Sequence, residues 1–197
     1  MSDTMNCFSI DIEGFVGSNI ESFPIDRKYQ DRARENYEIE ANMDVILVLL
    51  SDLDIRGTFF LLGRLAVDVP ALVKKTAEAG HEIAFHGYEH RRLFGMEREE
   101  FGKELGFANA IFEEATGIRV YSFRASDFST TASSLWTFDI LKRSILSVIQ
   151  TYTRRIFWKH MVFSVRRRSN KLIEVSPSIA GAFRAMRQLY NRERRHL

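Results

Sequence analysis

Short strand-like runs alternate with helix-like segments over the first 141 residues, and this alternation restricts the possible folds more than any other feature. Apolar, β-branched and aromatic runs predict strands over residues 6–12, 57–62, 82–85 and 120–123. Apolar residues three and four positions apart predict a helix over residues 37–53, and proline in the first turn with Gly80 just past the end predicts one over residues 70–79. A charged amphipathic pattern closed by Gly117 predicts a helix over residues 96–116, and another helix is expected over residues 133–141. Strands that alternate with helices through short connections are usually parallel and joined by right-handed crossovers. The sequence therefore predicts an α/β fold, either a barrel or an open parallel sheet.

The length and composition of the chain are those of one domain. With 197 residues, 45% of them hydrophobic, the chain can bury one sizeable core but is too short for two ordinary domains. No run reaches the roughly 18 apolar residues of a membrane span, and no basic and apolar leader stands at the N-terminus. The single cysteine, Cys7, gives no sign of an oxidising compartment. We therefore expect one domain over residues 1–197, without a membrane span and located in the cytoplasm.

Ionisable side chains stand at the ends of three predicted strands. Asp11 and Glu13 end the first strand, His86 and His90 follow the third, and Arg124 follows the fourth. Functional groups of parallel α/β folds gather at the carboxyl ends of the strands. We therefore expect these five side chains to lie close together.

The residue types in this group are typical of a hydrolytic metal site. Asp11 and Glu13 alone are more typical of a solvated turn than of a metal site, whereas histidines four residues apart can meet one ion when they share a face of a helical turn. Two imidazoles and one carboxylate, with open positions for water, are the ligands of hydrolytic zinc and related divalent sites. The sequence therefore predicts a divalent metal site, with Zn2+ as the expected ion, and a second carboxylate that is free to act as a base.

Three segments resemble the first three motifs of the NodB-homology polysaccharide deacetylases, in their usual order. They are SIDIEG, EIAFHGYEHRRL and FRASDFS, and the first is similar to the branch of the family that carries Asp-x-Glu. The resemblance extends over residues 8–141, and LIEVSPS at residues 172–178 is similar to a later strand of that branch. It implies a distorted, incomplete (β/α) barrel of the NodB type. It also implies metal-dependent hydrolysis of the N-acetyl groups of an amino-sugar polymer, with an N-acetylated glycan as partner.

The resemblance implies a role for each of the five residues. Asp11 is the general base, Glu13, His86 and His90 are the metal ligands, and Arg124 orients and tunes Asp11. The chemistry agrees with these roles, since a metal ion polarises an amide carbonyl and acidifies its water while a base takes the proton.

Three further residues are candidates to contact the glycan. Phe128 and Ser129 continue the third motif, and Tyr88 lies between the two histidines. For Tyr88, core packing is the interpretation that we favour over glycan contact.

The chain departs from the family pattern in two places. Ser126 stands where the third motif usually carries proline, and the histidine of the last motif is missing: His160 lies in a basic run and His196 is the penultimate residue. A truncated remnant that retains a metal site without turnover is therefore an alternative. Another alternative is an amidohydrolase of a small cyclic imide or amide, because the Asp-x-Glu branch resembles such enzymes too.

Residues 142–168 are unusually basic, with eight lysines or arginines and no acidic residue. If residues 148–167 are back-translated and read from the third base of each codon, suitable synonymous codons give an amino-acid string that resembles the family sequence at this place. One hypothesis is therefore that part of the segment is encoded out of frame. The alternative is a genuine basic surface for nucleic acid, an anionic glycan or lipid headgroups. We do not expect nucleic acid to be the main partner.

Overall fold

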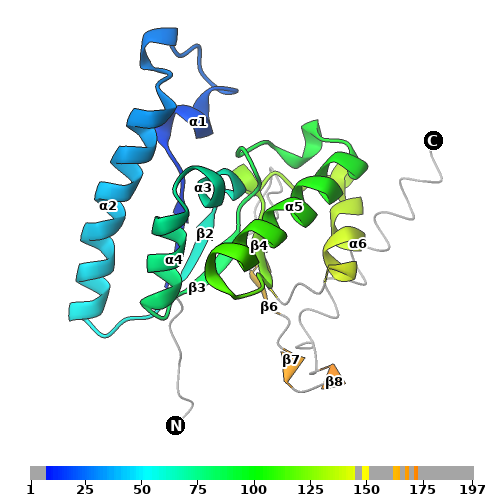
Figure 1. Cartoon of the computed structure of the whole chain (residues 1–197). Coiled ribbons are helices and arrows are strands. Elements are labelled where there is room, and N and C mark those ends of the chain that lie inside the picture. Colours follow the sequence, from blue (N-terminus) through cyan, green and yellow to red (C-terminus); the bar gives the residue numbers. More distant parts are fainter. Residues whose placement is uncertain (1–7, 145–147, 151–161, 165–166, 169–170, 173–197) are drawn as a thin grey trace, which may run out of the picture.

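Five strands pair in parallel, in the order in which they occur along the chain (Figure 1). The computed structural model describes residues 8–144, 148–150, 162–164, 167–168 and 171–172. The parallel strands are β1 (Ser9–Ile12), β2 (Thr58–Leu61), β3 (Glu82–Phe85), β4 (Ser122–Arg124) and β5 (Val148–Gln150). β6 (Val162–Ser164) pairs antiparallel with β5, and β7 (Arg167–Arg168) pairs with β8 (Lys171–Leu172) in a separate sheet.

A sequential order of parallel strands is that of a (β/α) barrel, whereas a doubly wound sheet reverses its order. The predicted α/β class and barrel type are confirmed. Among the described residues β1 pairs with β2 alone, so the sheet is open at that edge.

In the part of the chain that the structure describes, six helices connect and cover these strands. They are α1 (Phe15–Asn19), α2 (Arg32–Asp52), α3 (Gly63–Asp68), α4 (Pro70–Glu78), α5 (Arg98–Thr116) and α6 (Trp136–Arg143). Short 3-10 turns lie at Arg27–Tyr29, Leu93–Gly95, Ser126–Phe128 and Ala132–Ser134. Helix α4 packs between α2 and α5, and α6 packs against α5 (Figure 1). No helix among these described segments is long and apolar enough to cross a bilayer.

The core lies between the central strands and the inner faces of the helices. Phe59, Leu61 and Phe85 are fully buried, and almost every residue of β2 and β3 is shielded from solvent. Strands of a parallel sheet that are covered on both faces read as continuous apolar runs rather than alternating ones. Helix α2 contributes a buried stripe with helical spacing, formed by Ile39, Met43, Leu47 and Leu50. The continuous run and the helical stripe are what the sequence pattern predicted.

Helix α2 is longer than predicted because its two ends are defined by polar and backbone contacts rather than by apolar spacing. It begins at Arg32, since the side chain of Asp31 accepts a hydrogen bond from the amide of Arg34 at 3.0 Å. At its other end Asp54 has a positive φ of 51°, and the amide of Ile55 donates to the carbonyl of Leu50 at 2.9 Å. This is a Schellman ending with aspartate in the position that glycine usually occupies.

Other elements also differ from the prediction. β4 runs from Ser122 to Arg124 rather than over residues 120–123, so Arg124 is the last residue of the strand and not the first after it. α6 begins at Trp136 because a reciprocal pair of hydrogen bonds between Thr131 and Ser134 caps a 3-10 turn before it. α1 and α3, of five and six residues, were not predicted.

Several predictions fall wholly or mainly outside the described residues. His160, His196 and most of the basic segment 142–168 and of residues 172–178 belong to this group. The out-of-frame hypothesis and the alternative of a basic surface therefore stay predictions.

Candidate metal centre

The strand register brings the ends of β1 and β3 to one edge of the sheet. Ile12 is opposite Leu61 of β2, and Leu61 is opposite Phe85 of β3. Glu13 and His86 therefore each lie one residue beyond matched strand ends. Asp11 projects to the same side as Glu13, because side chains two residues apart share one face of an extended segment.

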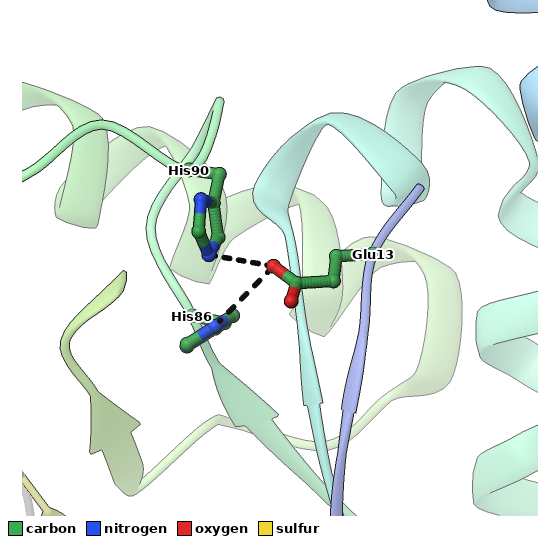
Figure 2. Close-up of side chains that lie close together, drawn as sticks. All are labelled: Glu13, His86 and His90. Carbon is green, nitrogen blue, oxygen red and sulfur yellow. Dashed lines mark ion pairs between the residues drawn. The ribbon is translucent and has the colours of Figure 1, made fainter. Parts of the chain in front are cut away.

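Three side chains at this edge point toward a common centre. Figure 2 shows the carboxylate of Glu13 facing the imidazole rings of both His86 and His90. Oε2 of Glu13 is 2.6 Å from Nε2 of His90 and 3.7 Å from Nε2 of His86, and the candidate ligand atoms all lie within 4.8 Å of one another. Two ligand atoms bound tetrahedrally to one zinc ion are roughly 3.3 Å apart. The donor set fits one divalent ion once the short contact between Glu13 and His90 opens by less than about 1 Å and the ligand atoms that lie up to 4.8 Å apart close by about 1.5 Å.

The orientation of His86 suits metal binding. Its Nδ1 donates to the backbone carbonyl of Arg124 at 2.9 Å, because a carbonyl can only accept, and Nε2 is left with a lone pair that faces Glu13. The ring is 2% exposed, and this burial lowers the pKa of His86 below its usual value. A neutral imidazole held by a carbonyl at its far nitrogen is the form that coordinates metal ions.

His90 reaches the centre from a loop. His86 and His90 were predicted to share a helical turn, and this was wrong: residues 86–92 form an irregular connection. Positive φ angles of 90° at Gly87 and 58° at His90 turn the chain back over the end of β3. The amide of Gly63, at the start of α3, donates to the carbonyl of Gly87 at 2.9 Å and helps to hold this loop. A left-handed histidine has no signature in the sequence, which is why the loop geometry was not predicted.

Glu13 and His90 form an ion pair in the absence of a metal ion. Burial raises the pKa of Glu13, but the hydrogen bond from His90 and the charge of His90 outweigh it and leave the pKa lowered. Burial lowers the pKa of His90, and the bond to Glu13 outweighs it, so that this pKa is raised. The hydroxyl of Ser18 also donates to Oε2 of Glu13, at 2.8 Å. Ser18 was missed because no motif marks a serine five residues after a ligand.

Asp11 and Arg124 form a second pair beside the first. Nη1 of Arg124 donates to Oδ1 of Asp11, Nη2 donates to the hydroxyl of Ser9 at 2.7 Å, and the guanidinium stacks on the ring of Phe60 at 3.9 Å. Oδ2 of Asp11 remains directed toward the centre, 3.8 Å from Nε2 of His86. The predicted proximity of all five residues is therefore what the structure has. Ser9 was missed, although it lies two residues before Asp11 on the same face of β1.

The three candidate glycan residues have different surroundings. Tyr88 is half-buried, and its ring packs against Phe107 of α5 with 5.7 Å between centroids. Phe128 is half-buried with a positive φ of 49°. The hydroxyl of Ser129 is buried and accepts a hydrogen bond from the amide of Leu93 at 2.9 Å, an arrangement that favours a role in holding the loop.

The serine that replaces the expected proline has a defined contact. The hydroxyl of Ser126 donates to the backbone carbonyl of His86 at 2.8 Å. Proline could not make this contact, because it has no side-chain donor. The departure from the family pattern therefore gives the first histidine an additional support.

Known proteins with similar sequences include deacetylases. Residues 30–141 match the sequence profile of a family described as polysaccharide deacetylase, a region that includes His86, His90 and Arg124 and begins after Asp11 and Glu13. A peptidoglycan-N-acetylglucosamine deacetylase from Bacillus cereus is 33% identical over 72 residues, which are 36% of this chain and 26% of the relative. A chitooligosaccharide deacetylase from Rhizobium leguminosarum bv. trifolii is 31% identical over 101 residues, which are 51% of this chain and 44% of the relative.

A solved structure has the same arrangement of elements. The crystal structure of a Mycobacterium smegmatis protein assigned to the polysaccharide deacetylases superposes with a TM-score of 0.58 at 26% identity, over 71% of this chain and 48% of that one. In each of these comparisons the chain spans less than half of the length of the matched protein.

Proposed function

Because the chain belongs to the polysaccharide deacetylase family, we propose that it hydrolyses the N-acetyl groups of an amino-sugar polymer at a divalent metal centre formed by Glu13, His86 and His90. The observation that carries this proposal is the convergence of one carboxylate and two imidazoles, with Nε2 of His86 oriented toward the carboxylate. Zn2+ suits this donor set best, since two nitrogens and one oxygen with open positions are typical of catalytic zinc sites. A bound ion supplies Lewis-acid polarisation of the substrate carbonyl and of a water molecule.

Asp11 acts as the general base in this proposal. Its Oδ1 is occupied by the guanidinium of Arg124, so that Oδ2 is the oxygen available to accept a proton from water. Oδ2 is 3.8 Å from Nε2 of His86, which puts it beside the group of ligand atoms. The stacking of Arg124 on Phe60 and its bond to Ser9 keep the guanidinium, and with it the carboxylate, in one orientation.

The reaction requires that one bond is formed and one is broken. The water oxygen bonds to the carbonyl carbon, the carbon–nitrogen bond of the amide breaks, and acetate leaves. The departing nitrogen takes up a proton, and protonated Asp11 is the group of the described centre that can return it. The sugar keeps a free amine.

The glycan class rests on the two relatives that act on N-acetylated sugars, one named for peptidoglycan and one for chitooligosaccharides. Both substrates carry the same acetamido group on a glucosamine ring. We therefore propose an N-acetylglucosamine polymer or oligomer as the substrate.

A metal-binding domain without turnover is the second candidate. Of the residues that the structure describes, three are histidines, and His81 accepts a hydrogen bond from the amide of Gly57 at 3.2 Å, at the far end of β3. No third imidazole therefore faces the centre within the described residues. A site without a second proton donor would bind the ion but turn over poorly.

Acetate release from chitooligosaccharides tests the proposal. The purified full chain is incubated with Zn2+ and N-acetylated oligomers, and the released acetate is measured. A parallel reaction contains a cyclic imide in place of the oligomers, and ring opening is measured. We expect acetate release that is abolished by a chelator and restored by added metal, and no opening of the imide. Metal binding without acetate would favour the second candidate, and imide opening would overturn the choice of substrate class.

A further inference from the structure

Arg64 is buried within α3 although it carries a charge. It is 2% exposed, and Arg124 is the only other buried arginine among the described residues. Arginine is rarely so buried unless its charge is paired. Its guanidinium meets several partners: Nη2 donates to Oε2 of Glu35 at 2.8 Å, and Nη1 donates to Oδ1 of Asn36 at 2.7 Å and to Oδ2 of Asp68 at 3.2 Å.

One of these partners leads to the segment that carries Glu13. The second oxygen of Glu35, Oε1, accepts a hydrogen bond from the amide of Gly17 at 2.8 Å. Gly17 adjoins Ser18, whose hydroxyl donates to Glu13. A Cβ placed on Gly14 would lie 2.0 Å from Cδ of Glu35, so the backbone of this segment rests directly on the glutamate.

Arg64 also reaches the loop that carries His90. Its backbone amide donates to the carbonyl of Tyr88 at 3.2 Å, and its Nε lies 3.8 Å from Oε2 of Glu89. Glu89 is the residue immediately before His90. Arg64 thus contacts the loop of His90 directly and the segment of Glu13 through the carboxylate of Glu35.

We propose that Arg64 is a positioning residue for the metal centre, which holds the segment of Glu13 and the loop of His90 at the separation that a divalent ion needs. The proposal rests on the proposed function, because it assumes that these residues bind a metal. Arginine suits this task, since its planar fork offers five donors and can bond several acceptors at once, whereas lysine offers one point charge. A purely structural role would instead make Arg64 a link between α2 and α3, with no effect on the metal.

Metal binding by variants of the full chain distinguishes the two roles. Arg64→Met removes the charge at similar length, and Arg64→Lys retains the charge without the fork. Glu35→Gln leaves one acceptor oxygen for two donors, Arg64 and the amide of Gly17, and so breaks the link between them. Asp68→Asn is the matched control, because Asp68 is a partner of Arg64 that contacts neither ligand segment. The readouts are the Zn2+ dissociation constant by chelator competition, the visible spectrum of the Co2+-loaded protein, and the thermal unfolding of the metal-free protein.

We expect Arg64→Met and Glu35→Gln to raise the dissociation constant by about tenfold or more and to change the Co2+ spectrum, as outer contacts of metal ligands typically do. The dissociation constant of Arg64→Lys should lie between those of the unmodified chain and Arg64→Met, and Asp68→Asn should bind Zn2+ like the unmodified chain. If Arg64→Met does not fold, the lysine and glutamine variants carry the test. If Arg64→Lys and Glu35→Gln both leave the dissociation constant and the Co2+ spectrum unchanged, the positioning role alone is overturned. Absence of metal from the unmodified chain would overturn the proposed function as well.

Discussion

Replacement of Asp11 with asparagine separates the base from the metal ligands. Asparagine has the shape of aspartate, and its carbonyl oxygen can take the place of Oδ1, because Arg124 only donates hydrogen bonds. The amide nitrogen then faces His86 in place of Oδ2 and cannot accept a proton. The variant therefore keeps the contact with Arg124 and loses the ability to act as a base.

The expected loss follows from the role of Asp11. A general base contributes about 10²–10⁴ in rate, which corresponds to roughly 3–5.5 kcal/mol at about 1.4 kcal/mol per factor of ten. Oδ2 of Asp11 lies outside the compact group formed by Glu13, His86 and His90, so metal content should be retained. Glu13→Gln should instead lose the metal, and with it the acetate release, because it removes the charge that both imidazoles face.

The assay combines the initial rate of acetate release with metal content on the same preparations. We expect Asp11→Asn to keep its metal and lose at least about a hundredfold in kcat, with KM nearly unchanged. Loss of the metal in Asp11→Asn would mean that Asp11 is a ligand. A kcat within tenfold of the unmodified chain would refute the assignment of Asp11 as the base.

Three further predictions concern stability and are checked by urea unfolding. Gly87→Ala should destabilise the chain by about 1–2 kcal/mol because of its positive φ, whereas Gly106→Ala, in an exposed helical position with open space around it, should stabilise by about 0.5–1 kcal/mol. Asp54→Gly should stabilise by about 1 kcal/mol, since it relieves a left-handed residue and removes a negative charge at the carboxyl end of α2; no gain would mean that the left-handed residue is not strained. Burial, and then the charge of Arg56, lower the pKa of His81, so that the folded chain excludes a proton that the unfolded chain binds below about pH 6.5. The stability contributed by neutral His81 should be complete above that pH and decline as the pH falls, and His81→Gln should reduce this dependence; an identical pH profile in the variant would contradict it.

The sequence predicted the elements that have a clear period or a strong local signal. β3 was predicted at its observed residues because an apolar run of three after Glu82 is bounded by Gly80 and His81 on one side and by the polar loop on the other. Helices α2 and α5 were predicted from their amphipathic patterns, and α4 was predicted from Pro70 in its first turn and Gly80 just past its end. α1 and α3 are too short for a period to be seen, and α3 follows β2 without a polar break.

The candidate site was predicted from topology, and its details were not. Parallel strands bring their ends together, which was enough to group Asp11, Glu13, His86 and His90. The direction of each side chain depends on contacts that no local pattern encodes, such as the bond from His86 to a backbone carbonyl 38 residues away. The buried Arg64 was missed for the same reason, because it lies 29 residues from Glu35 in the chain and joins no motif.

Metal content of the purified chain, measured by mass spectrometry, tests the central claim most directly when His86→Ala is compared with His81→Ala. Both histidines are buried at opposite ends of β3, but only His86 faces Glu13. We predict about one divalent ion per chain in the unmodified protein and in His81→Ala, as expected of one site with three protein ligands, and loss of the ion in His86→Ala. An unmodified protein without metal, or a His86→Ala variant that keeps it, would contradict the account.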